Sequence, residues 1–204
     1  MTFQFCDDLG PNGFGWVVEE AATRTSHALA SDESVWLVDP LDWPEAIDRA
    51  LDLGEPAGVV QLIDRHKRDC AVLAARLGVP HVVAPHALPG SPFTFNDVLN
   101  RRLWRESALW WPETRTLVVA EALGTNRFYT GGTALIGVHA VLRPRPPKTL
   151  GAYEPERILF GHGEGIVAPD AAAALDDALR TSLRRLPGVL LRLPLATRAP
   201  SRPR

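Results

Sequence analysis

One segment near the middle of the chain constrains the fold more than any other. Residues 58–63 form an apolar run typical of a buried strand, and residues 64–69 form a densely charged turn directly after it. A helix is expected from about residue 69 to 77, followed by Gly78, and residues 80–84 have the pattern of another strand. A strand, a crossover helix and a second strand pair in parallel, so functional residues are expected in the loops at the carboxyl ends of these strands.

Short strands and helices are predicted on both sides of this βαβ unit. Alternating or apolar runs indicate the strands, and apolar residues at three- and four-residue spacings indicate the helices. Residues 85–105, which contain several prolines, are expected to be irregular. The predicted strands are 15–19, 26–30, 34–39, 107–111, 116–120 and 157–160, and the predicted helices are 43–54, 133–142 and 169–186.

The composition fits one globular domain. Of the 204 residues, 46% are hydrophobic and 23% are charged, and a chain of this length buries roughly 70% of its unfolded surface around one core. We expect a single domain over residues 1–194, because no linker divides this range. Residues 195–204 contain three arginines and no acid, and they are predicted to be a flexible basic tail.

Charge and cysteine usage argue against several classes of protein. The net charge is −2, which does not favour nucleic acid as a partner. No stretch approaches the ~20 apolar residues of a membrane span, so no membrane association is expected. The first eight residues have no basic region, and two cysteines are too few for a disulfide framework, so a cytoplasmic location is expected.

Three loops stand out as places for a functional site. The charged turn of residues 64–70 follows one apolar strand, Gly161-His162-Gly163 follows another, and Glu121 lies at the end of a third. Loops of this kind gather on one edge of a sheet. The sequence therefore predicts that these three loops lie close together.

This order of elements resembles the metallo-β-lactamase superfamily. The resemblance covers residues 14–182. It rests on Asp39 at a strand end, the turn of residues 64–70 that opens a helix, the hairpin at 111–113, and Gly161-His162-Gly163. The fold that the resemblance implies is of the α+β or α/β class, a four-layer αββα sandwich with two facing sheets.

The sequence departs from the metal-ligand pattern of that superfamily. With Asp69 as the motif aspartate, Arg65, Lys67 and Cys70 stand where the family has histidines, and Arg102 falls near a further histidine position. Fixed cations repel a metal dication, and arginine cannot become a ligand. We therefore expect the dizinc centre to be absent, with the cations paired to the remaining carboxylates or binding a small anionic molecule.

The resemblance also names the residues that remain for chemistry. Glu121 corresponds to the bridging aspartate of the family and His162 to its last histidine, and Asp69 and His162 are the catalytic candidates if the site is active. A different register of the turn uses His66 and discards Asp69. His86 is a substitute ligand on a loop, and His27 and His139 are expected to be structural. The expected pocket is Arg65, His66, Lys67, Arg102 and Glu121; a metal, zinc or iron, would be held by Asp69, Cys70, Glu121 and His162.

Three functions remain open from the sequence. The first is a metallo-β-lactamase-like protein with a vestigial or anion-binding pocket and no cofactor. The second is a hydrolase with a reduced site, in which zinc or iron activates water toward an ester, thioester, lactone or phosphoester. The third is a protein-interaction module, a homodimer being one form of it, whose exposed tryptophans and arginines near residues 101–105 bind protein.

Overall fold

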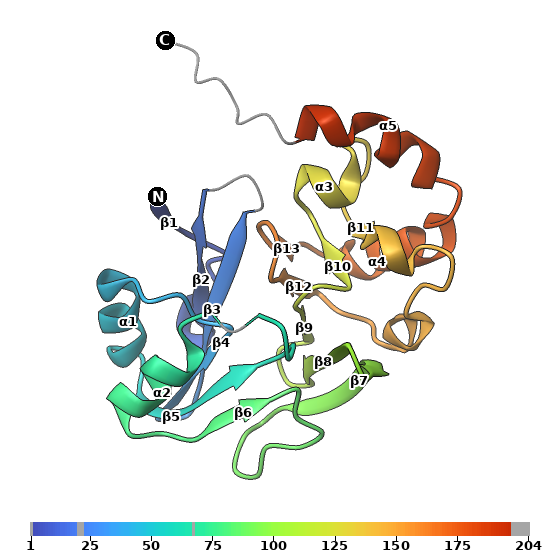
Figure 1. Ribbon diagram of the computed structural model, residues 1–204. Coiled ribbons are helices and arrows are strands. Elements are labelled where there is room, and N and C mark those ends of the chain that lie inside the picture. The colour runs from blue at the N-terminus through green and yellow to red at the C-terminus, as the bar shows by residue number, and fades with distance from the viewer. Residues whose placement is uncertain (1, 20–22, 67, 197–204) are drawn as a thin grey trace.

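The computed structural model describes residues 2–19, 23–66 and 68–196. Its strands form two main sheets, which face each other, and helices cover their outer faces (Figure 1). Figure 1 shows α1 and α2 against the first sheet and α4 on the far side of the second. The expected four-layer αββα sandwich is therefore confirmed.

The first sheet has six strands in the order β1 to β6, and it contains the predicted βαβ unit. β5 pairs in parallel with both β4 and β6, and α2 crosses over between β5 and β6. Gly78 ends α2 with a φ of 70°, a left-handed conformation that glycine adopts without strain. The bounds are β1 Phe3–Cys6, β2 Gly13–Val18, β3 Arg24–Ser31, β4 Ser34–Val38, α1 Pro44–Leu51, β5 Glu55–Gln61, α2 Cys70–Leu77 and β6 His81–Val83.

The second sheet has the strand order β13-β12-β9-β8-β7. β8 and β9 form the predicted antiparallel hairpin, and β9 pairs in parallel with β12. The loops after β9 and β12 therefore leave the same edge of the sheet side by side. The bounds are β7 Thr94–Arg101, β8 Trp104–Trp111, β9 Thr116–Val119, β10 Leu123–Gly124, α3 Arg127–Thr130, β11 Gly137–Val138, β12 Arg157–Phe160, β13 Ile166–Val167, α4 Ala171–Thr181 and α5 Leu186–Ala196.

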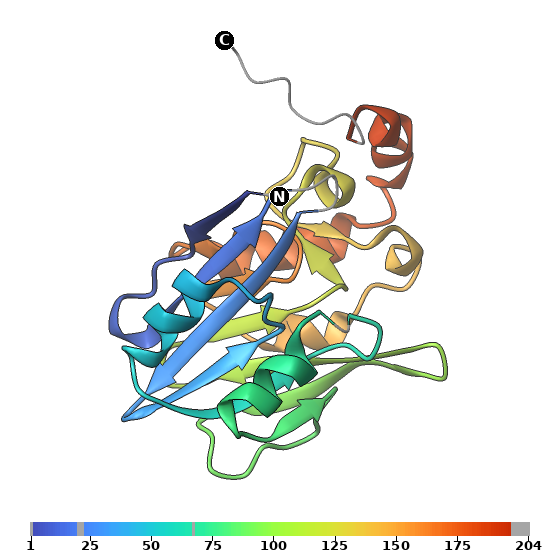
Figure 2. The same cartoon turned by 60° about the vertical axis from the view of Figure 1, so that its left-hand side comes forward.

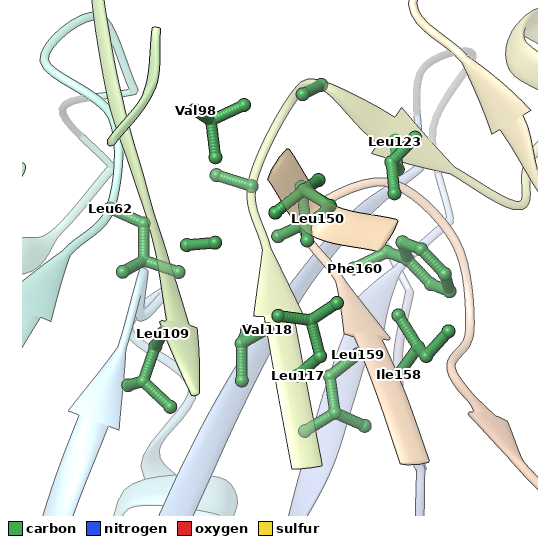
Figure 3. Close-up of a cluster of buried hydrophobic side chains, with 14 of the residues drawn as sticks. Leu62, Val98, Leu109, Leu117, Val118, Leu123, Leu150, Ile158, Leu159 and Phe160 are labelled. Carbon is green, nitrogen blue, oxygen red and sulfur yellow. The ribbon is translucent and has the colours of Figure 1, made fainter. Parts of the chain in front are cut away.

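Two apolar clusters hold the layers together. One fills the space between the first sheet and its helices α1 and α2. The other lies between the two sheets and continues beneath α4. In it, Leu62, directly after β5, lies among residues of the second sheet such as Leu109 and Val118 (Figure 3). The sheets also meet at an isolated bridge between Ile63 and Glu106. This bridge fixes the turn after β5 against β8, and Figure 2 shows the same two layers from another side.

Three local predictions were wrong. Residues 94–101, expected to be irregular, form β7, because an edge strand with polar side chains has no clear apolar alternation. Residues 133–142 are not a helix: they contain β11 and a 3-10 turn at Ala140–Leu142, since Gly137 packs closely on the carbonyl of Tyr129. The predicted helix 169–186 is divided, with α4 ending at Thr181.

The C-terminal segment begins as a helix. α5 extends to Ala196 and so includes the first two residues of the predicted tail, and residues 197–204 lie outside the described residues. Among the described helices, none has the length and apolar character needed to cross a bilayer.

Candidate metal centre

Three side chains from three loops meet at one edge of the sandwich. His66 lies in the turn between β5 and α2, Glu121 follows β9, and His162 follows β12. Their ligating atoms all lie within 4.8 Å of one another. The predicted convergence of these loops is therefore present in the structure.

The two histidines approach the same oxygen of Glu121. Nε2 of His66 lies 2.5 Å from Oε2, and Nε2 of His162 lies 3.0 Å from it. The two imidazole rings meet edge to face, with their centroids 5.1 Å apart. Two imidazole nitrogens thus converge on one carboxylate oxygen.

The ring of His162 is anchored on its other side. Its Nδ1 lies 3.0 Å from the carbonyl oxygen of Thr23. A carbonyl oxygen only accepts hydrogen bonds, so Nδ1 carries the hydrogen and donates it. Metal-binding histidines commonly donate their second nitrogen to a carbonyl in this way, which directs the first nitrogen at the metal.

The second oxygen of Glu121, Oε1, is held by two donors. The hydroxyl of Tyr129 lies 3.1 Å away, and Nε2 of His139 lies 3.4 Å away. Nδ1 of His139 accepts the backbone N–H of Val141, so its Nε2 carries the hydrogen. The two oxygens of Glu121 therefore differ, because Oε1 is bound by donors and Oε2 faces two imidazole nitrogens.

The charges of the cluster are strongly coupled. Burial acts to raise the pKa of Glu121, but hydrogen bonds and charge from His162 and His66 outweigh it and hold this pKa well below its usual range. Burial lowers the pKa of His139, although Glu121 opposes the shift. Burial also raises the pKa of Tyr129, so its hydroxyl stays protonated as a donor.

A buried acid positions the loop that carries Glu121. Oε1 of Glu106, on β8, accepts the backbone N–H of Glu121 at 2.8 Å and that of Ala122 at 2.9 Å. Its Oε2 accepts the indole N–H of Trp104 at 2.9 Å. Burial raises the pKa of Glu106 to about 7, although these hydrogen bonds oppose the shift. Sequence analysis missed Glu106, because an acid within a strand has the same pattern as a solvent-facing residue.

Arg68 forms a second support beneath the site. Its Nη1 donates to the carbonyl of Asp39 at 2.8 Å and also to that of Thr25, and its Nη2 donates to the carbonyl of Gly161 at 2.9 Å. Burial lowers the pKa of Arg68, and the charge of Asp39 opposes this shift. One guanidinium therefore connects β3, the end of β4 and the loop that carries His162.

The structure separates Asp69 and Cys70 from this cluster. The carboxylate of Asp69 accepts the backbone N–H of Asp42 at 2.8 Å. Cys70 is fully buried in the apolar layer between α2 and the first sheet, where burial raises the pKa of its thiol. Glu121 and His162 are instead joined by His66, as in the alternative register of the turn.

Of the predicted cations among the described residues, Arg65 and Arg102 make no contact with the three side chains of the cluster, although Arg65 lies within electrostatic reach of His139. The guanidinium of Arg65 stacks 4.7 Å from the ring of Trp104, and Arg102 is exposed in the turn between β7 and β8. Lys67 lies outside the described residues. Arg68, from the same charged turn, is a cation within electrostatic reach of Glu121, and no local pattern distinguishes it from its neighbours.

Three further histidines lie in different places. His86 is exposed and pairs with Asp97, and His27 is buried against Asp7. His139, expected to be structural, lies beside Glu121.

A cavity of about 250 Å³ opens beside Glu121 and His139. Its lining residues are Glu121, Asn126, Phe128, Tyr129, His139, Ala140 and His162.

Comparison with solved structures shows the fold. The metallo-β-lactamase from Pontibacter korlensis aligns with a TM-score of 0.62 at 10% identity, covering 89% of this chain and 100% of that one. DIM-1 metallo-β-lactamase exposed to ceftazidime aligns with 0.59 at 11%, covering 88% and 97%. VMB-1 aligns with 0.55 at 12%, covering 86% and 98%. The chain therefore has the metallo-β-lactamase fold.

No family model matches the sequence, and no curated protein matches it. The likeness is thus one of structure, at identities of 10–12%.

Proposed function

We propose that this protein is a hydrolase of the metallo-β-lactamase fold that uses one metal ion, zinc or iron, in place of a dizinc centre. The observation that carries the proposal is the convergence of His66 Nε2 and His162 Nε2 on a single oxygen of Glu121. Two imidazoles and one carboxylate are a ligand set of catalytic zinc, and of iron(II) in sites with open positions.

The hydrogen bonds around the cluster fit a metal. Because Nδ1 of His162 donates its hydrogen to the carbonyl of Thr23, a neutral ring has its lone pair on Nε2, the nitrogen that faces Glu121 and that a metal would bind. Among the described residues, Nδ1 of His66 is buried and has no hydrogen-bond partner, so no contact found there prevents His66 Nε2 from presenting its lone pair. A cation between the three atoms would satisfy both nitrogens and the carboxylate together.

A single ion agrees with the rest of the site. Among the described residues, these three form the only group of three or more ligating side chains. Asp69 and Cys70, which would be needed for a further ligand set, are directed elsewhere. Arg68 already places a positive charge within electrostatic reach of Glu121, which disfavours a second dication.

A metal held by His66, Glu121 and His162 would lower the pKa of a bound water toward neutrality and would polarise a substrate carbonyl or phosphoryl oxygen. Tyr129 and His139 restrain Oε1 of Glu121, so that the carboxylate presents Oε2 in a fixed orientation. The carbonyl of Thr23 does the same for the ring of His162. The substrate class that suits this chemistry is an ester, thioester, lactone or phosphoester.

Elemental analysis of protein purified from metal-replete cells tests the proposal. We expect one equivalent of zinc or iron per chain, lost in His162→Ala and in Glu121→Gln but kept in His86→Ala, a change at an exposed histidine outside the cluster. Hydrolysis of a generic ester should disappear on chelation and return with metal. Two equivalents per chain would overturn the single-ion site, and a metal-free protein would favour the vestigial one.

A further inference from the structure

We infer that the cavity beside Glu121 and His162 binds an uncharged, apolar acyl group of the substrate, and that Phe128 is its specificity-determining residue. The inference rests on the proposed function and adds the substrate class to it. The cavity has a volume of about 250 Å³ and includes both residues in its lining, so a group bound there is joined directly to the reacting centre.

The cavity wall away from the metal ligands is mainly apolar. Phe128 is half-buried and Ala140 adds a small side chain, while the ring of Tyr129 stacks on that of His162 with centroids 5.8 Å apart. Oδ1 of Asn126 accepts the backbone N–H groups of Phe128 and Tyr129, so this oxygen is already engaged. Such a wall stabilises apolar groups by removing them from water.

The wall away from the proposed metal position offers no partner for an acidic group. The lining residues include no lysine or arginine, and their one acid is Glu121. A carboxylate at the far end of the bound group would lie against this apolar wall, with no lysine or arginine in the lining to pair with it. An uncharged acyl group avoids this cost of burying an unpaired charge.

The size and rigidity of the cavity favour a short to medium chain. Its volume lies below the roughly 300–1,000 Å³ of sites for drug-sized ligands. The backbone of Tyr129, which forms part of its wall, is held in place by the buried guanidinium of Arg143. Nη2 of Arg143 donates to the carbonyl of Tyr129 at 2.5 Å, and Nη1 donates to that of Ser182 at 3.0 Å. The pocket is therefore formed before a ligand binds.

The kinetic test uses p-nitrophenyl acetate, butanoate and octanoate with the zinc-loaded protein. We expect kcat/KM to rise roughly two- to fourfold per methylene until the cavity is filled. Phe128→Ala should lower the octanoate-to-acetate ratio about tenfold, and Ala140→Leu, which narrows the cavity, should lower it without removing a large side chain. Val72→Ala, an exposed site on α2, is the matched control and should keep the ratio.

A binding test separates this inference from the proposed function. Calorimetric titration of the chelator-treated protein with octanamide, which is uncharged and not an ester, should show binding that Phe128→Ala weakens. Octanamide binding without any metal-dependent hydrolysis would overturn the proposed function and keep the acyl pocket. Metal-dependent hydrolysis with the same kcat/KM for all three esters, or a preference for p-nitrophenyl hemisuccinate over the butanoate, would overturn the acyl pocket alone.

Discussion

The backbone N–H of Glu121 donates to the carboxylate of Glu106 at 2.8 Å, so one buried acid on β8 positions a second acid at the end of β9. The same oxygen accepts the N–H of Ala122, which leaves the loop after β9 with little freedom. Glu106 does not contact the proposed metal position through its own side chain. It is a positioning residue for Glu121, the proposed ligand.

Removing this carboxylate should destabilise the protein. Glu106→Ala leaves the N–H groups of Glu121 and Ala122 and the indole N–H of Trp104 without their acceptor, at an expected cost of roughly 2–4 kcal/mol. Urea unfolding of the chelator-treated protein measures it. Glu113→Ala, in the exposed turn between β8 and β9, should change stability by less than about 0.5 kcal/mol. Equal losses in the two variants would contradict the positioning role.

The raised pKa of Glu106 predicts a pH dependence of stability. Its pKa is about 7 in the folded chain against 4.5 ordinarily, so the folded state binds this proton more tightly than the unfolded state. The stability that comes from Glu106 is complete below about pH 4.5 and is lost as the pH rises through 7. Glu106→Gln should therefore gain roughly 1–3 kcal/mol relative to the parent protein between pH 5 and 8, measured by unfolding at each pH. A constant difference across this range would show that Glu106 has an ordinary pKa.

Arg68 should matter far more than an exposed arginine nearby. Arg68→Met removes the donors to three carbonyl groups in three segments and is expected to cost roughly 2–4 kcal/mol. Arg76→Met breaks a bidentate pair with Asp42 on the surface of α2 and should cost less than about 1 kcal/mol. Thermal or urea unfolding of both variants compares them directly, and similar losses would mean that the guanidinium of Arg68 contributes no more than a surface pair.

His139 should influence metal affinity without being a ligand. His139→Leu removes the donor to Oε1 of Glu121, which then has more freedom to turn away from His66 and His162. Loss of such an outer contact typically weakens metal binding by about 10- to 100-fold. Competition with a chelating dye measures the dissociation constant, with His86→Ala as the control. An unchanged constant would place His139 outside the metal centre.

A pair of glycines gives a test of close packing at the site. A Cβ on Gly161 would lie 2.3 Å from the carbonyl oxygen of Ala120, directly before Glu121, whereas a Cβ on Gly151 would meet nothing nearer than 3.5 Å. Gly161→Ala should therefore cost about 3 kcal/mol or more and weaken metal binding, and Gly151→Ala should be nearly neutral. Melting temperatures and metal titration check both effects, and a neutral Gly161→Ala would show that the two loops can move apart.

The sequence predicted those parts of the molecule that depend on local pattern. The βαβ unit, the β8–β9 hairpin and the positions of Glu121 and His162 follow from apolar runs and from the rule that parallel strands direct their loops to one edge. The choice between His66 and Asp69 does not follow from such patterns. Both belong to one charged turn, and its conformation depends on the bridge between Ile63 and Glu106, more than 40 residues apart in sequence.

The roles of His139 and Arg68 at the site could not be predicted from the sequence for a similar reason. His139 lies in a segment where short strands and 3-10 turns give no regular period, and only its contact with Glu121 distinguishes it. Arg68 is one of several cations in the same turn, and its burial depends on carbonyl groups from β3, from Asp39 and from Gly161. Tertiary contacts of this kind produce no periodic pattern in the amino-acid sequence.

The three residues of the centre come from both sheets: His66 follows β5 of the first, and Glu121 and His162 follow β9 and β12 of the second. An ion bound by all three is bound only while the two halves of the sandwich face each other. Its binding free energy is then added to the cooperative folding of the whole chain, about 2.7 kcal/mol at a free concentration one hundred times the dissociation constant. A metal bound at the proposed site would thereby stabilise the whole sandwich against unfolding, not only the loops that hold the ion.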